Sequence, residues 1–108
     1  MRIDIKPLSV NESWQGKRFK TDKYKLYERA CLFMLPKLNV PPKGKLQIEF
    51  VFGLSNKSSD WDNPIKPIQD IMQKKYGFND NRIYRAIVEK VDVEKGNEFI
   101  EFNITELK

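Results

Sequence analysis

Histidine does not occur in the 108 residues of this chain. Its absence excludes Ser-His-Asp and Cys-His catalysis, zinc sites that need two histidines, and nucleases that use a histidine base. Cysteine occurs once, as Cys31. One cysteine cannot form an internal disulfide or a structural zinc site, so the sequence favours a reducing cytoplasm. We expect Cys31 itself to be a small buried apolar residue.

Apolar runs long enough to cross a membrane are also missing. No run of about 18 apolar residues occurs, so we expect no membrane span. The first residues, Met1–Ile5, lack the apolar centre of a signal peptide, so we expect no secretion signal. The length suits one domain with a single modest core, and we expect that domain to span residues 1–108.

Charge, in contrast, is abundant. The chain holds 20 lysines and arginines against 15 aspartates and glutamates, which gives a net charge of +5. The isoelectric point is about 9.3. Such a balance favours a polyanionic partner, nucleic acid first and an anionic membrane surface second. A basic domain whose charges are merely solvated stays open as the plain alternative.

Alternation of apolar and polar residues predicts the strands. The clearest strand is 45–54, and shorter ones are expected at 2–6, 82–92 and 98–104. The residues that face one side of the clearest strand are Leu46, Ile48, Phe50 and Phe52. We expect the last two strands to form a hairpin around the turn Lys95-Gly96-Asn97.

Apolar residues at helical spacing predict two helices. The first runs from a cap at Thr21 or Asp22 to about Leu35, where Pro36 stops it. The second occupies about residues 64–75. Strand, helix, strand, helix and hairpin together predict an α+β fold, a small mixed sheet of about four strands with two helices packed on it.

Prolines complicate the start of the second helix. Asn63 suits its N-cap, Pro64 its first position and Gly77 its end. Pro67 is unfavourable there because it lacks an amide donor. Either the first turn is distorted, or the regular helix starts at Lys66.

Residues 8–20 show no clear period. We expect a long loop or an irregular ribbon there, and segments of this kind are often functional.

Two acids at a spacing of two, Asp60 and Asp62, lie where the clearest strand gives way to the second helix. In an extended segment both would face one side, and a helix would bring Lys66 to the same edge as Asp62. Together with Asp80, these carboxylates are suitable ligands for Mg²⁺ or Mn²⁺. Lys66 would then orient a water or offset charge that develops on a phosphate.

The same residues also have a purely structural interpretation. An Asp before a helix is an ordinary cap, and Asp62 with Lys66 would be a solvent-exposed ion pair of small value. Asp70 either supports Lys66 at a spacing of four or is solvated. Trp61 alternates away from both acids, so we expect it to anchor them to the core.

Basic residues flank the acids, with aromatic residues between them. The basic ones are Lys17, Arg18, Lys20, Lys23, Lys57, Lys74, Lys75 and Arg82, and the aromatic ones are Trp14, Phe19 and Tyr76. This mixture suits phosphate contacts with some base stacking. Taken one at a time, each basic residue is more often a solvated surface charge.

The chain resembles RusA-type Holliday junction resolvases, which are often encoded by phages or prophages. The resemblance lies in Asp60-Trp61-Asp62-Asn63-Pro64-Ile65-Lys66, followed by Asp70 and by Asn79-Asp80-Asn81-Arg82-Ile83. The family pattern is D-x-D-N-x-x-K-x-x-x-D, then an acidic pair with an aliphatic residue shortly after. Pro7–Trp14 is similar to the family's early S-x-N-x-x-W segment, and the basic stretch Lys17–Lys20 follows it. The resemblance covers nearly the whole chain.

The resemblance implies a homodimeric, Mg²⁺-dependent endonuclease, able to use Mn²⁺ as well, that resolves four-way DNA junctions by paired symmetric incisions in recombination and repair. Asp60, Asp62 and Asp80 would be the metal ligands, and Lys66 the catalytic lysine. No nucleotide cofactor and no membrane are expected, and the compartment would be the cytoplasm of a bacterium or a phage-infected cell. The expected DNA contacts are Asn11, Trp14, Lys17, Arg18, Lys20, Lys57, Lys74, Lys75 and Arg82.

The sequence also departs from the family pattern. Asn79 stands where many relatives have the first acid of a pair, and its uncharged amide is at most a weak ligand. Pro64 and Pro67 make the helix start unusual, but neither departure removes a residue assigned to catalysis. The alternative function is a non-catalytic basic module that recognises branched DNA and uses the acids as helix caps. Such a module would bind DNA in a salt-sensitive way without nicking it.

Overall fold

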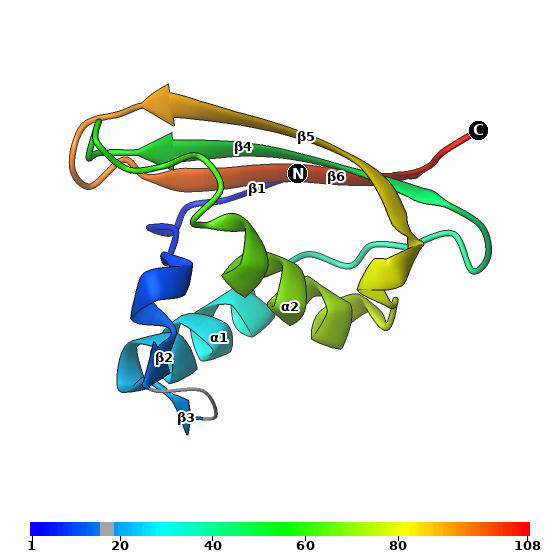
Figure 1. The fold of residues 1–108 in the computed structure, drawn as a ribbon, viewed down its shortest axis with the longest axis horizontal. Helices are drawn as coiled ribbons and strands as arrows, with labels where there is room; N and C mark the ends of the chain where they lie inside the picture. Colours follow the sequence, from blue (N-terminus) through cyan, green and yellow to red (C-terminus); the bar gives the residue numbers. More distant parts are fainter. Residues whose placement is uncertain (16–18) are drawn as a thin grey trace.

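The computed structural model describes residues 1–15 and 19–108. They form two layers, a curved sheet with two helices on one of its faces (Figure 1). The sheet strands are β1 (Arg2–Ile3), β4 (Leu46–Leu54), β5 (Ile83–Asp92) and β6 (Phe99–Glu106), and the helices are α1 (Asp22–Met34) and α2 (Ile65–Tyr76). The predicted α+β class, a mixed sheet with two helices, is confirmed.

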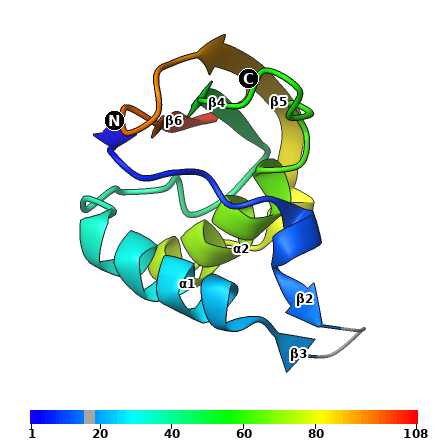
Figure 2. The same cartoon turned by 90° about the vertical axis from the view of Figure 1, so that its left-hand side faces the viewer.

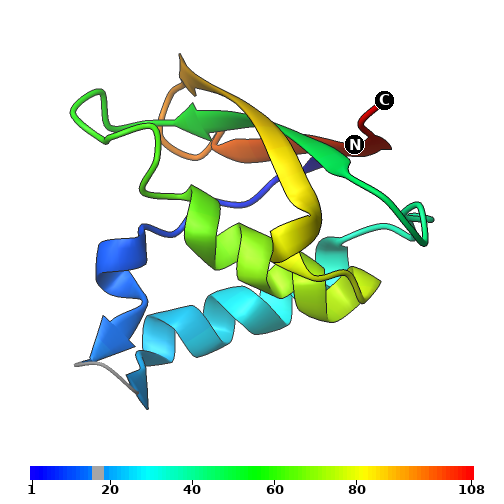
Figure 3. The ribbon, with the colours of Figure 1, turned by 45° about the vertical axis from the view of Figure 1, so that its right-hand side comes forward.

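The strand order β1-β6-β4-β5 gives β4 a neighbour on each side. It pairs antiparallel with β6 and parallel with β5, so that Phe50 lies opposite Phe102 on one side and Val88 on the other. Parallel strands need a crossover connection, and α2 supplies it between β4 and β5. Figure 3 shows β5 at the rim of the sheet.

The predicted hairpin of the last two strands is wrong, because β4 lies between β5 and β6. The turn itself exists: Gly96 has φ +97°, and the amide of Asn97 donates to the carbonyl of Glu94 at 2.9 Å. The chain then crosses the end of β4, where the ring of Phe99 lies so close to Gly53 that any Cβ there would collide with it. Alternation along a strand shows which face is buried but does not select its partner.

Helix α1 begins and ends where the sequence predicts. Oγ1 of Thr21 accepts a hydrogen bond from the amide of Tyr24 at 3.1 Å, so Thr21 is the N-cap. The helix ends at Met34, and its C-cap Leu35 lies directly before Pro36. It lies beside α2 under the sheet (Figure 2). Within residues 1–15 and 19–108, no helix is long and apolar enough to span a membrane.

Helix α2 starts at Ile65, between the two predicted starts. Pro64 occupies the cap position without a side-chain hydrogen bond, so the predicted cap at Asn63 is wrong. Pro67 is the third residue of the helix, within the first turn, where amides have no helical acceptor in any case. Its ring is fully buried. Gly77 ends the helix with φ +74°, as predicted.

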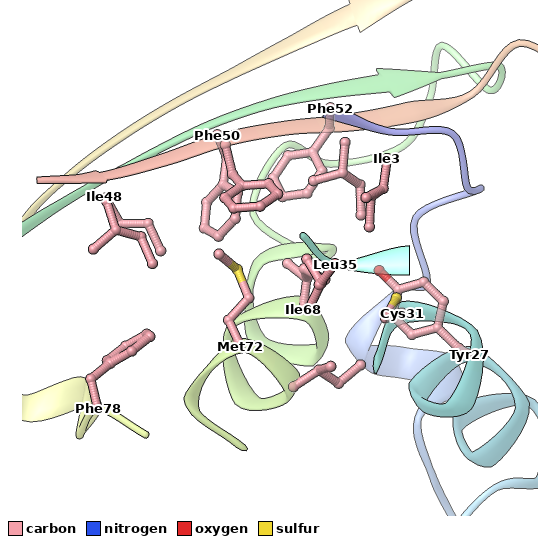
Figure 4. Close-up of a cluster of buried hydrophobic side chains, with 14 of the residues drawn as sticks. Ile3, Tyr27, Cys31, Leu35, Ile48, Phe50, Phe52, Ile68, Met72 and Phe78 are labelled. Carbon is pink, nitrogen blue, oxygen red and sulfur yellow. The ribbon is translucent and has the colours of Figure 1, made fainter. Parts of the chain in front are cut away.

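The core lies between the sheet and the helices (Figure 4). Phe50 and Phe52 point from β4 towards Ile68 and Met72 of α2, and the two phenylalanine rings stack with centroids 5.1 Å apart. Cys31 of α1 is completely buried, as predicted, and this burial raises the pKa of its thiol to about 12.

The stretch at residues 8–20 contains short regular pieces. A 3₁₀ helix, η1 (Val10–Glu12), precedes two short strands, β2 (Trp14–Gln15) and β3 (Phe19–Lys20), which pair antiparallel. The expectation of an irregular ribbon there is therefore close to the structure. The first predicted strand is shorter than expected, since only Arg2–Ile3 pairs with β6.

Candidate functional site

The two acids of the first motif lie in the turn that leads into α2. Trp61–Pro64 form this turn, and a hydrogen bond from the amide of Ile65 to the carbonyl of Asp62, at 3.2 Å, closes it. Asp60 and Asp62 are both exposed. The expected extended segment is wrong, because a turn replaces it. The predicted position of the acids just before the helix is confirmed.

Lys66 is the centre of a polar network on the exposed side of α2. Its Nζ lies 2.9 Å from Oδ1 of Asp70 and 3.5 Å from Oδ2 of Asp80. Gln73 closes the network: its Nε2 donates to Oδ1 of Asp70 at 3.2 Å, and its Oε1 accepts from the amide of Asp80 at 3.0 Å. Asp70 therefore supports Lys66, one of its two predicted roles. Lys66 pairs with Asp70 and Asp80 instead of the expected Asp62.

These contacts keep Lys66 charged. The hydrogen bond to Asp70 is the main cause that raises the pKa of Lys66 above its ordinary value of 10.5. The negative charges of Asp70 and Asp80 add to this effect, and partial burial opposes it. The amine is protonated at neutral pH, so it is suited to offset negative charge and not to accept a proton.

Gln73 and Asn79 have roles that the sequence reasoning did not assign. Gln73 joins Asp70 to the backbone of Asp80. The available signal was its helical spacing, since it follows Asp70 by three residues and Lys66 by seven. Asn79 caps the short 3₁₀ helix η2 (Asp80–Arg82), because its Oδ1 accepts from the amide of Asn81 at 3.1 Å. The amide in place of an acid thus fixes the backbone that carries Asp80.

The N-terminal segment contacts the acidic turn. The amide of Val10 donates to the carbonyl of Asn63 at 2.9 Å. Between the two segments lies a cleft of about 170 Å³, and Ser9, Glu12 and Asp60 are among the residues that line it. Two segments that carry the family resemblance, far apart in the sequence, are therefore neighbours in the fold.

The acids offer suitable donors for a hard cation without forming one cluster. Asp60, Asp62 and Asp80 carry the oxygen ligands that Mg²⁺ prefers. In the described part of the chain, no three acidic or cysteine side chains are gathered closely enough to hold a metal ion. Beside Asp80 lies the ammonium of Lys66. The donor chemistry fits Mg²⁺, but the three carboxylates do not converge in this arrangement.

Several basic residues expected to contact DNA are engaged within the protein. Lys20 and Lys74 both pair with Glu28, each at 3.3 Å. Arg82 donates from its guanidinium to two carbonyls of the connector 41–44, at 3.0 and 2.6 Å. Arg82 therefore holds the connector to the start of β5, a structural role that the sequence did not indicate.

Other expected DNA contacts face solvent. The exposed ones are Asn11, Trp14, Lys57 and Lys75, and the amine of Lys75 also donates to the carbonyl of Leu32 at 3.1 Å. Trp14 is 40% exposed, and its ring lies 6.0 Å from that of Tyr24. Lys17 and Arg18 lie outside the described residues.

Trp61 is not in the core, so its predicted anchoring role is wrong. It is 54% exposed. With Ile65, Ala86 and Val88 it lines a shallow apolar groove of about 500 Å³ between the start of α2 and β5. The prediction failed because residues 61–64 form a turn, where the alternation rule for strands does not apply.

No protein-family model matches the chain, and no curated protein matches it. The resemblance to RusA-type resolvases therefore rests on the motif residues themselves. What it implies about activity belongs to the proposal below.

Proposed function

We propose that this protein is a Mg²⁺-dependent endonuclease of the RusA type that cuts branched DNA. The observation that carries the proposal is the network of Lys66, Asp70, Gln73 and Asp80. It joins two parts of the motif that are fourteen residues apart, beside the turn that holds Asp62. The ion pair of Lys66 and Asp70 is therefore part of a larger network with Gln73 and Asp80, and is not an isolated pair of surface charges.

Composition and the N-terminal contact support the same proposal. Because the chain has no histidine, metal held by carboxylates is the simplest catalytic option. The net charge of +5 suits a polyanionic substrate. The bond between Val10 and Asn63 brings the early segment of the resemblance to the acidic turn.

Each residue of the site has a distinct proposed role. The residues that would hold Mg²⁺, or Mn²⁺ in its place, are Asp60, Asp62 and Asp80, and metal binding would require their side chains to turn towards one point. When bound, the metal would polarise a phosphoryl oxygen and activate a water. Lys66, kept protonated by Asp70, would face the phosphate and offset the charge that develops on it. Gln73 would keep Asp70 and the backbone of Asp80 in place.

The substrate and the assembly follow the resemblance. The proposed substrate is a four-way DNA junction, resolved by a homodimer through paired symmetric incisions in recombination and repair. Exposed basic and aromatic residues near the site would contact the backbone and bases of the DNA. The proposed compartment is the cytoplasm of a bacterium or a phage-infected cell.

Cleavage of a synthetic four-way junction tests this proposal. In Mg²⁺ the protein is expected to nick the junction symmetrically, and Asp62→Asn is expected to bind it while cleavage falls by on the order of 100-fold or more. The matched control is Asp4→Asn, since Asp4 is also an exposed acid and pairs only with Arg2 among the described residues. Failure of the folded protein to nick junctions in both Mg²⁺ and Mn²⁺ would refute the enzymatic proposal.

A non-catalytic DNA-binding module is the second candidate. The observation in its favour is the ammonium of Lys66 beside Asp70 and Asp80, which neutralises acids that would otherwise repel phosphate. This candidate predicts junction binding that falls steeply with salt, is independent of Mg²⁺ and produces no nicks. The cleavage assay distinguishes the two.

A further inference from the structure

Strand β5 leaves one of its edges without a partner strand in the described part of the chain. It is the last strand in the order β1-β6-β4-β5, and none of its ten residues is fully buried. Three of its large apolar residues are exposed, Tyr84 at 65%, Ile87 at 50% and Val91 at 37%. An unpaired edge with this much apolar surface is a template for another strand.

The two faces of β5 are distinct. Arg85, Ile87 and Glu89 are in register with Gln47, Glu49 and Val51 of β4, which alternate with the buried core residues. They therefore lie on the face of the sheet away from the helices. Ala86 and Val88 lie on the helix face, in the apolar groove beside Trp61 and Ile65.

The sequence of β5 is complementary to itself when reversed around Ile87. In an antiparallel pair of two β5 strands centred there, Ile87 lies opposite Ile87 of the second copy. Arg85 then lies opposite Glu89, and Ala86 opposite Val88, each pair occurring twice. Opposite charges and apolar residues are the cross-strand pairs that stabilise a sheet.

Neighbouring registers lack this complementarity. A pair centred on Ala86 places Arg85 opposite Ile87 and Glu89 opposite Ile83. A pair centred on Val88 places Arg85 opposite Val91 and Glu89 opposite Ile87. Both leave the charges against apolar side chains, so the register centred on Ile87 is favoured.

We propose that β5 pairs antiparallel with β5 of a second copy of this chain, centred on Ile87, to form one continuous sheet. The two-fold axis passes midway between the two Ile87 residues, perpendicular to the sheet, so both helical layers lie on the same face. The apolar grooves beside Trp61 then meet across the axis. The proposal rests on the strand and not on nuclease activity. If the proposed function holds, it places both acidic turns on one side of the dimer, facing one DNA molecule.

Charge reversal tests the surface through the molar mass in solution, measured by light scattering or sedimentation at several concentrations. The wild type is expected to be a dimer. Arg85→Glu and Glu89→Arg each place like charges opposite one another, and each is expected to weaken the dimer by at least about tenfold. The double variant restores opposite charges and should dimerise like the wild type. Arg29→Glu, an exposed arginine on α1, is the control with the same change in charge.

A disulfide tests the register. Residue 87 lies opposite itself, so the two Cα atoms of Ile87→Cys would be about 4.5–5.5 Å apart, which suits a disulfide. Glu89→Cys is the matched control, because its two copies would lie about 13 Å apart along the strands. The native Cys31 is fully buried and does not interfere. Oxidation is expected to cross-link Ile87→Cys and not Glu89→Cys.

Several results would overturn the proposal. One is a wild type that stays monomeric at every concentration. Another is a dimer that is insensitive to both single charge reversals, which would place the interface elsewhere. Equal cross-linking of the two cysteine variants, or a double variant that stays monomeric, would refute the register. All of these readouts are independent of DNA cleavage, so a failed nuclease assay leaves them unchanged.

Discussion

Strands β4 and β5 lie side by side and have opposite environments. Alternate side chains of β4 fill the core, whereas β5 has no fully buried residue although it carries five aliphatic or aromatic side chains besides Ala86. β4 has a neighbour on each side and the helices below it. The difference shows that position within the sheet, more than apolar content, determines how a strand is stabilised.

Polar contacts hold β5 where burial does not. At its start, Lys66 pairs with Asp80 and Arg82 binds the connector 41–44. At its end, the amine of Lys90 donates to two carbonyls of the loop after β4, at 3.3 and 2.8 Å. The amide of Val93 then donates to Leu54 at 3.0 Å. β5 is therefore fixed at both ends and exposed in the middle, as suits a surface for association.

Matched isoleucines on the two strands give the largest expected contrast. Ile48 of β4 is fully buried and Ile87 of β5 is half exposed. Ile48→Ala should lower the free energy of unfolding by about 2–5 kcal/mol, because it leaves a cavity in the core. Ile87→Ala should cost less than about 1 kcal/mol when measured in an Arg85→Glu background, at a protein concentration where that variant is monomeric. Urea unfolding checks both, and equal losses would contradict the contrast.

Removal of the Arg82 hydrogen bonds at the start of β5 should have an intermediate effect on stability. Arg82→Gln loses charge-assisted hydrogen bonds to two backbone carbonyls, so we expect a loss of about 1–3 kcal/mol in the free energy of unfolding. Amide hydrogen exchange should accelerate in the first residues of β5 and not in the centre of β4. Arg29→Gln on α1 is the matched control. Uniform acceleration in both strands would show that Arg82 supports the whole fold.

Substitution of Lys66 should have the smallest effect on stability. Lys66→Met should cost less than about 1 kcal/mol, because the pairs with Asp70 and Asp80 are partly exposed and screened by solvent. The pKa of Lys66 is raised in the folded protein, so its contribution is complete below 10.5 and is lost as the pH rises through the raised value. The difference between wild type and variant should therefore shrink above pH 10.5.

Urea unfolding of both proteins at about pH 8 and about pH 11 measures this change. Burial raises the pKa of Tyr24 and of Cys31 to about 12 each, so both proteins lose stability in alkali. That loss is common to the two and cancels in the difference. A difference that stays constant between the two pH values would contradict the role of the Lys66 charge.

The elements with strong local signals could be predicted from the sequence. The alternation of β4, the Thr21 cap and the Gly77 stop each depend on a few neighbouring residues, and all three are confirmed. The partner of β5 could not be predicted, because Lys95-Gly96-Asn97 makes the same turn whether the strands it joins are adjacent or not. Strand pairing is a property of the whole sheet.

The sequence predicted which residues belong to the candidate site better than it predicted how those residues contact one another. Asp60, Asp62, Lys66 and Asp80 were selected by residue type and spacing. Spacing by four residues offered Lys66 two partners, Asp62 and Asp70, and in the structure Lys66 contacts Asp70. Lys66 also reaches Asp80, which depends on the course of the chain through Gly77 and η2. No local pattern contains that information.

The place of β4 between its two neighbours also bears on how the protein is made. Both of those neighbours, β5 and β6, follow it in the chain, so during synthesis β4 emerges before any strand that can pair with it. Such non-local pairing is slow, and an unpaired apolar strand is prone to aggregate in the meantime. Lysines flank it closely in the sequence, at Lys43, Lys45 and Lys57. Their mutual repulsion disfavours association between nascent copies until the sheet is complete.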